Sequence, residues 1–230
     1  MQPNPTVLAF DTSAAHCAAA LLKDDAILGE RMDLLARGQA EHLMGMLEAM
    51  LTGEGLTWAD LDAIGVGIGP GNFTGTRISV SAARGLALSL NKPAIGVSMF
   101  EVMRLCAGSG LAAEPTELVC LKAPRGDAYV QHFRYGEAQS PPRQINPDLP
   151  QEELRLSANS VVYGYRADDI AKSFDARAVP AVLADIGAHI ARIAKGRVVG
   201  KKEAITRPAP LYVRAADAAP PKNPAPVILP

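Results

Sequence analysis

One short segment restricts the fold of this chain more than any other. It is an apolar run, Ala63 to Ile68, that enters a glycine-rich loop, GPGNFTG, from Gly69 to Gly75. A helical pattern follows the loop and continues to about Leu90. A buried strand that passes through a tight turn into a helix is the repeating unit of α/β proteins. We therefore expect an α/β fold.

The rest of the chain alternates in the same way. Further strands are expected at residues 7–10, 17–22, 26–32, 94–97, 118–123, 128–134 and 160–163, and helices at 39–51, 98–107 and 180–195. Two successive blocks each open with two strands and later add helices, which indicates a duplicated α/β architecture with a smaller second half.

The domain boundary is expected where small and turn-forming residues gather, at Gly108–Pro115. The prediction is then a first lobe at residues 1–107 that carries the interface helices, a second lobe at 108–217, and a Pro/Ala-rich tail at 218–230. Ser140–Pro150 contains four prolines and is expected to be a loop.

Composition excludes several classes of protein. The 230 residues are 48% apolar and carry a net charge of -1, so the chain lacks the basic surplus typical of proteins that bind nucleic acid alone. We see no signal peptide and no apolar run of the roughly 20 residues that span a membrane. Three cysteines without a CxxC motif indicate free thiols in a reducing compartment, so we expect a cytoplasmic protein.

The turn after the first strand is a candidate phosphate site. Asp11, Thr12 and Ser13 follow the buried run 7–10. A carboxylate and two hydroxyls at the end of a strand can organise a phosphate and its Mg²⁺. The alternative is a polar turn whose side chains bond their own backbone, and these residues alone favour that alternative by roughly two to one.

The glycine loop is the second half of that candidate site. Free amides at Gly69, Gly71 and Thr74, next to a helix N-terminus, can bind an anion. The loop lacks the GK[ST] of a P-loop and the GxGxxG of a dinucleotide fold. The alternative is a steric one, in which glycine lets two backbone segments approach closely, and the sequence leaves both alternatives open.

The second half argues against catalysis. Phosphoryl transfer needs metal-binding carboxylates on both sides of a nucleotide. The residue expected to mirror Asp11 is Lys122, a cation, and Asp127 lies beyond the following turn. The four histidines are far apart in sequence, without HExxH or HxxxH spacing. We expect neither catalytic nor metal-binding residues.

Two helices of the first half are candidates for an interface with another subunit. Residues 39–51 are rich in methionine, and residues 74–90 carry stripes of small side chains that allow close helix approach. The alternative is that both helices pack only on their own sheet. The partner surface is expected to contain seven residues: His42, Met46, Met50, Ser79, Ala82, Ala83 and Leu86.

These segments resemble the TsaB (YeaZ) family of tRNA threonylcarbamoyladenosine biosynthesis proteins. The similarity is carried by VLAFDTS, DLDAIGVGIGPGNFTGTRISVSAARGLA and KPAIGVS, and more weakly by RGDAYV and by the closing residues 210–214. The chain departs from the family's pattern at Asn72, where Ser is common, and at Lys122, where Asp is common.

The resemblance implies a two-lobed actin/Hsp70-like (ASKHA) fold and a non-catalytic subunit. It implies a homodimer that exchanges for a heterodimer with a catalytic TsaD-type subunit, with a TsaE-type ATPase joining and TsaC-type enzymes supplying threonylcarbamoyl-adenylate. The catalytic paralogue carries a metal-binding HxxxH where this chain reads VSMFEVM, Val97 to Met103.

The resemblance further implies that ATP and Mg²⁺ bind only in the partner complex, that tRNA is contacted at most indirectly, and that no membrane is involved. The alternatives are a kinase-like or M22-type (glyco)peptidase enzyme and a nucleotide-binding regulator.

Overall fold

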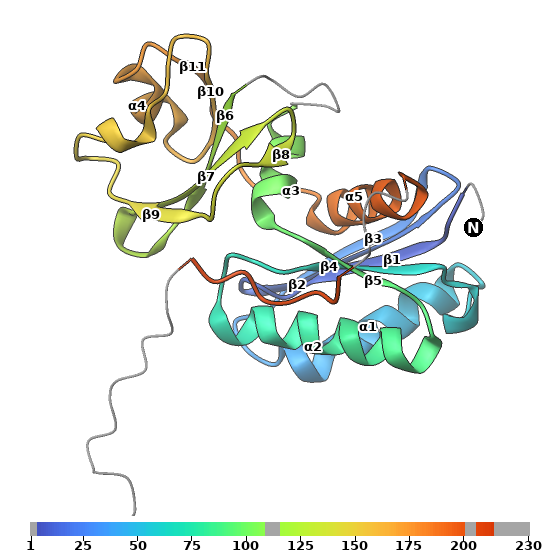
Figure 1. Cartoon of the computed structure of the whole chain (residues 1–230). Helices are drawn as coiled ribbons and strands as arrows, with labels where there is room; N and C mark the ends of the chain where they lie inside the picture. The colour runs from blue at the N-terminus through green and yellow to red at the C-terminus, as the bar shows by residue number, and fades with distance from the viewer. Residues whose placement is uncertain (1–3, 109–115, 201–205, 214–230) are drawn as a thin grey trace, which may run out of the picture.

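The computed structural model describes residues 4–108, 116–200 and 206–213 and places them in two α/β lobes (Figure 1). The sheet of the first lobe has the strand order β3-β2-β1-β4-β5. Its elements are β1 (Val7–Asp11), β2 (His16–Lys23), β3 (Ala26–Leu34), α1 (Gln39–Gly53), a 3-10 turn (Trp58–Asp60), β4 (Ala63–Gly67), α2 (Phe73–Leu90), β5 (Ala94–Val97) and α3 (Met99–Cys106). The expected α/β class and two-lobed form are confirmed.

The second lobe contains a smaller set of elements around the order β11-β10-β6-β7-β8, with β9 also paired to β7. They are β6 (Glu117–Lys122), a 3-10 turn (Pro124–Gly126), β7 (Ala128–Arg134), β8 (Glu137–Ala138), β9 (Arg143–Ile145), a 3-10 turn (Glu152–Leu154), β10 (Val161–Gly164), α4 (Ala167–Lys172) and β11 (Arg177–Val179). A final helix, α5 (Ile186–Gly200), follows.

The two sheets repeat one pairing scheme. In the first, β1 pairs antiparallel with β2 and parallel with β4, and β5 extends the parallel side. In the second, β6 pairs antiparallel with β7 and parallel with β10, and β11 extends the parallel side. The expected duplication is therefore confirmed by topology, although the two halves share no clear repeat in sequence.

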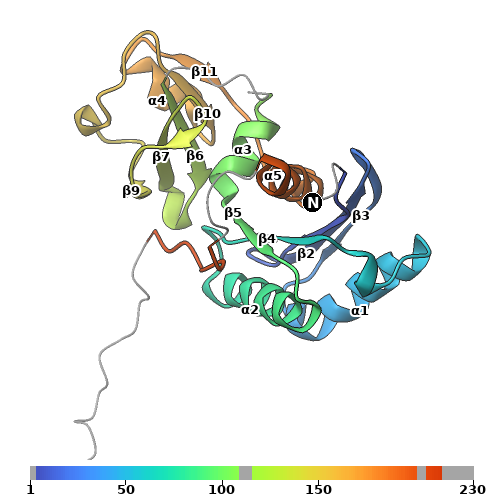
Figure 2. The ribbon, with the colours of Figure 1, turned by 45° about the vertical axis from the view of Figure 1, so that its right-hand side comes forward.

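The first sheet is covered on both faces (Figure 2). Side chains of β1 alternate between the faces: Leu8 and Phe10 join a core with α1 and α2, whereas Val7 and Ala9 join a core with α5. Because both faces are covered, every residue of β1 is buried, which explains its uninterrupted apolar run.

The position of α5 corrects the expected lobe boundary. Although α5 follows the second sheet in sequence, Ile190 and Ala194 pack on the first sheet, against its β1 side. Leu211 also belongs to the first lobe, because its N–H donates to the Ile68 carbonyl at 2.8 Å. The prediction that residues 108–217 form one second lobe is therefore wrong for α5 and Leu211. The physical reason is that the apolar face of β1 and β2 has to be buried, and α5 buries it. All of the expected boundary at Gly108–Pro115 except Gly108, and the tail at 218–230, lie outside the described residues.

Two other expectations are wrong in detail. The last helix begins at Ile186 rather than at Pro180, because the chain from residue 180 to 185 runs as an irregular connection against α3, where the Ala184 N–H lies 3.4 Å from Cys106 Sγ. The proline-rich loop at 140–150 contains the short strand β9, which lies along the edge of β7.

All three cysteines are unpaired, as expected. None of the described helices is both long enough and apolar enough to cross a membrane.

A glycine pair on α5 tests its packing against the first sheet. A Cβ at Gly187 would lie 2.6 Å from the Ala19 carbonyl carbon, whereas a Cβ at Gly196 would meet no atom within 4 Å. Gly187→Ala should lower the free energy of unfolding by about 1–3 kcal/mol through overpacking. Gly196→Ala should raise it by about 0.5–1 kcal/mol, because alanine has the higher helix propensity. Urea unfolding measures both, and equal midpoints for the two variants would contradict the packing.

Candidate functional site

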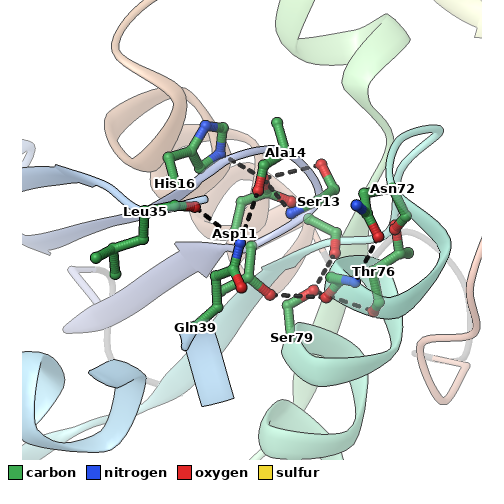
Figure 3. Close-up of polar contacts among 12 residues, drawn as sticks. Asp11, Ser13, Ala14, His16, Leu35, Gln39, Asn72, Thr76 and Ser79 are labelled. Carbon is green, nitrogen blue, oxygen red and sulfur yellow. Dashed lines mark hydrogen bonds and ion pairs between the residues drawn. The ribbon is translucent and has the colours of Figure 1, made fainter. Parts of the chain in front are cut away.

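The first candidate site is the turn at the end of β1, where Asp11 organises its own surroundings (Figure 3). The Asp11 side chain is completely buried. Its Oδ2 accepts hydrogen bonds from the Ser13 N–H and the Ser13 hydroxyl, both at 2.9 Å, and lies 2.9 Å from His16 Nε2. These contacts match the polar turn that the sequence favoured, in which the carboxylate bonds its own backbone.

The second carboxylate oxygen, Asp11 Oδ1, is buried and has no hydrogen-bond partner among the described residues. It faces the backbone of β4, since a Cβ added at Gly67 would lie 2.0 Å from it. His16 is the neighbouring group that can carry compensating charge, and its side chain is only 10% exposed. The stability of the fold should therefore depend strongly on His16, because a buried carboxylate is costly when no neighbouring group can balance its charge.

The glycine loop approaches the same turn backbone to backbone. A Cβ at Gly75 would lie 1.9 Å from the Thr12 carbonyl oxygen, and one at Gly71 would lie 2.3 Å from the Ser13 carbonyl oxygen. The Thr12 hydroxyl donates to the Gly75 carbonyl at 2.7 Å. Glycine is required here because no side chain fits between the two segments. The steric alternative is therefore the one that the geometry supports.

The amides at the start of α2 are used within the loop (Figure 3). The side-chain oxygen of Asn72, Oδ1, accepts from the Thr74 N–H at 2.9 Å and from the Gly75 N–H at 3.2 Å. The Asn72 carbonyl accepts from the Thr76 N–H at 2.9 Å. Asn72 therefore caps the helix, so these groups are not free to hold a phosphate.

The structure thus brings together the six residues of the expected phosphate site: Asp11, Thr12, Ser13, Gly69, Gly71 and Thr74. Their polar contacts, however, are with one another, with the neighbouring loop, with His16 and with the Met99 N–H. We interpret the cluster as a structural junction between β1 and α2. Nucleotide binding at this junction stays a prediction.

The duplicated topology places Lys122 at the position equivalent to Asp11. Each is the last residue of the first strand of its sheet, paired with Ala128 and Ala18 respectively. Lys122 is exposed, and Asp127 beyond the turn is held by the Gln144 amide at 2.5 Å. Within the described ranges, no three His, Cys, Asp or Glu side chains lie close enough to hold a metal ion.

The second candidate site is a groove between α1 and α2 of about 490 Å³. It is lined by Ala40, Leu43, Met44, Phe73, Thr74, Arg77, Ile78, Ser81 and Ala82. Most of these side chains are apolar, and Met44 and Phe73 are exposed. An exposed apolar groove between two helices is a common docking site for a partner helix or subunit.

Three residues of the expected partner surface do not face this groove and need correction. Met46, Ser79 and Ala83 are buried against the chain's own sheet. The Ser79 hydroxyl lies 3.1 Å from the Gly67 carbonyl of β4, to which it donates. The small stripe of α2 therefore lets the helix lie close to its own sheet, and another subunit cannot reach it.

Of the remaining expected residues, Ala82 lines the groove, whereas Met50 and Leu86 are half-buried and pack against the core that α1 and α2 share with the first sheet. His42 Nε2 lies 2.5 Å from Asp33 Oδ2, which ties α1 to β3. Hydrogen bonds from Arg31 and then from His42 hold the pKa of Asp33 below its ordinary value. His42 thus positions α1 rather than lining the groove.

Phe73 and Arg77 also line the groove, although the sequence did not mark them as partner-surface residues. The Phe73 ring lies 5.1 Å from the ring of Tyr212, and the Arg77 guanidinium lies 3.7 Å from the centre of the Phe73 ring. The Arg77 Nε–H also donates to the Tyr212 hydroxyl at 2.8 Å. The spacing of Phe73, Arg77 and Ser81 at i, i+4 and i+8 was the available signal for this outward face.

Comparison with known proteins places the chain among tRNA-modification proteins. The model of the TsaD family, tRNA N6-adenosine threonylcarbamoyltransferase, matches residues 33–146. The TsaB protein of Escherichia coli K12 is 30% identical over 165 residues, which are 69% of this chain and 70% of that protein. The TsaB protein of Bacillus subtilis is 32% identical over 130 residues, 56% of each chain.

Solved structures agree with the fold. The structure of YeaZ from Pseudomonas aeruginosa superposes with a TM-score of 0.66 at 25% identity, covering 90% of this chain and 99% of that one. A Pseudomonas aeruginosa protein described as similar to peptidase YEAZ superposes with a TM-score of 0.68 at 23% identity, covering 91% and 100%.

The buried Asp11–His16 pair supplies a test of the junction. His16→Ala leaves the buried carboxylate with its Ser13 hydrogen bonds alone and should lower the free energy of unfolding by about 1–3 kcal/mol. The double variant Asp11→Asn, His16→Ala should be more stable than His16→Ala alone, because the buried charge is gone. His42→Ala breaks a more exposed pair and should cost less than about 1 kcal/mol. Chemical unfolding gives all three values; similar losses for His16→Ala and His42→Ala would count against the account.

Proposed function

Because the chain belongs to the TsaB (YeaZ) family, we propose that it takes part in forming N6-threonylcarbamoyladenosine in tRNA as a non-catalytic subunit. Its role is to bind and support a catalytic TsaD-type subunit. The groove between α1 and α2 is the observation that carries this proposal, because it is an exposed apolar surface on two well-packed helices.

The groove has the features of a protein interface. Its floor is fixed by Leu43, which is buried in the core, while Met44 and Phe73 are exposed at its walls. Methionine adapts its shape to a partner, and aromatic and arginine side chains such as Phe73 and Arg77 are enriched among residues that contribute most to binding. When the chain is alone, a second copy occupies this surface and forms a homodimer.

The polar groups support a non-catalytic role. The Asp11 turn is bonded within the chain, and the equivalent position in the second lobe is the exposed cation Lys122. The segment where the resemblance places a metal-binding HxxxH in the catalytic paralogue instead contributes Met99, Phe100 and Met103 to the apolar core. ATP, Mg²⁺ and a TsaE-type ATPase are accordingly assigned to the partner complex.

A second candidate function is a nucleotide-binding regulator, and one observation favours it. Asp11 Oδ1 is buried and has no hydrogen-bond partner among the described residues. A buried carboxylate oxygen of this kind is suited to bind a cation or a water molecule. Calorimetric titration of the lone chain with ATP and Mg²⁺, and then of the chain with its TsaD-type partner, separates the two functions. Binding and turnover by the lone chain would instead favour a kinase-like or peptidase-like enzyme.

Two exposed serines on α2 test the partner surface. Ser81 lines the groove, whereas Ser89 lies on the same helix outside it. Ser81→Arg should weaken the complex with the TsaD-type subunit at least tenfold, because a charged side chain then fills the groove. Ser89→Arg should leave affinity within about twofold, since surface changes are usually mild. Isothermal titration gives both affinities.

Thermal unfolding of the two variants serves as the control for folding, and both should match the parent chain. Ser79→Arg and Ala83→Arg should instead lower the unfolding midpoint, because both positions are buried. An undiminished complex with Ser81→Arg would show that the partner binds elsewhere.

A further inference from the structure

A second hollow of about 500 Å³ lies at the other end of α2. It is formed by the last turns of that helix, the connection into β5 and residues 206–208, and it is separate from the groove described above. Its lining residues include three cations, Arg84, Lys92 and Arg207, together with the neutral hydrogen-bonding residues Asn91 and Thr206.

The charges in this hollow are unbalanced. None of its lining residues is acidic. The side chains of Arg84, Lys92 and Arg207 form no ion pair or hydrogen bond with another residue in the described ranges. Three like charges that share one hollow repel one another, so an anion bound among them would be stabilising.

The dipole of α2 explains only part of this concentration of charge. The C-terminal end of a helix carries a partial charge of about -0.5, which favours a cation nearby. One lysine is enough to balance it, and Asn91 already caps the helix in the left-handed conformation. A surplus of about two positive charges remains for an external ligand.

We propose that this hollow binds backbone phosphates of an RNA strand. Arginine and lysine bind phosphate through charge-assisted hydrogen bonds, and Asn91 and Thr206 can donate to phosphate or ribose oxygens. The lining contains no aromatic side chain on which a base could stack, so the hollow suits a sugar-phosphate backbone better than a free nucleotide.

This inference rests on the proposed function, whose substrate is a tRNA. It departs from the expectation that tRNA is contacted at most indirectly. Three cations neutralise at most three phosphates, so the contact is weak in the lone chain at physiological salt and adds to the contacts that a partner makes. The overall charge of -1 does not oppose it, because binding depends on the local arrangement of charge.

The test uses the full chain, a fluorescently labelled tRNA transcript and anisotropy titrations between about 20 and 200 mM salt. The pocket variant carries Arg84→Ala, Lys92→Ala and Arg207→Ala. It should bind at least tenfold more weakly at low salt, and its slope of log affinity against log salt should shrink by about 2–3. Thermal unfolding confirms that the three surface changes leave the fold intact.

A matched variant removes the same charge elsewhere. Arg134, Lys172 and Arg192 are exposed on β7, α4 and α5, and their replacement by alanine should leave the slope unchanged. Equal losses in the two triple variants, or no detectable RNA binding by the parent chain at low salt, would overturn the proposal. So would a pocket variant that loses binding of ATP while keeping that of RNA, because the hollow would then serve a small phosphate ligand.

Affinity for the TsaD-type subunit is measured on the same proteins. The pocket variant should retain it, since the hollow and the α1–α2 groove share no lining residue. If the parent chain fails to bind that subunit while the RNA result holds, the proposed function fails and the RNA site stands. If partner binding holds and the RNA result fails, only the RNA site is withdrawn.

Discussion

The close approach of two backbone segments fixes the geometry of the first lobe. The turn after β1 and the loop before α2 meet at carbonyl-to-glycine distances that admit no side chain, as at Thr12 and Gly75. Hydrogen bonds from the Thr12 hydroxyl and the Asn72 N–H join the two segments. Because this junction sets where α2 begins, it also sets the helix face that packs on the sheet and the face that remains exposed.

The junction determines both how the polar groups at the end of β1 are bonded and which face of α2 is exposed. Polar groups that resemble a phosphate site are used to hold α2 against β1, with Asp11 and Asn72 bonded to nearby backbone. Holding α2 in this place leaves Phe73, Arg77 and Ser81 on the outside beside α1. The bonds that hold α2 against β1 therefore also leave an exposed apolar face on α2, as the proposed partner-binding role requires.

The two lobes differ although they share one topology. The first sheet is covered on both faces because α5 returns to it from beyond the second sheet, with Gly187 allowing direct contact with β2. One face of the second sheet packs with the short helix α4 in a smaller core around Leu118 and Val162, and its other face joins the core that contains α3 and α5. Lys122 occupies the position that Asp11 occupies in the first lobe, so the duplication preserved the fold and not the polar site.

Local sequence patterns determined most of the secondary structure of this protein. The apolar runs of β1 and β4, the capping box at Ser98 and Glu101, and the glycine loop predict their elements because each depends on residues adjacent in sequence. Tertiary structure alone decided which sheet receives α5, that Ser79 and Ala83 face inward, and that Arg207 lines the same hollow as Arg84. Those outcomes depend on contacts between distant segments, and the spacing of residues along one helix cannot show which of its faces another segment will cover.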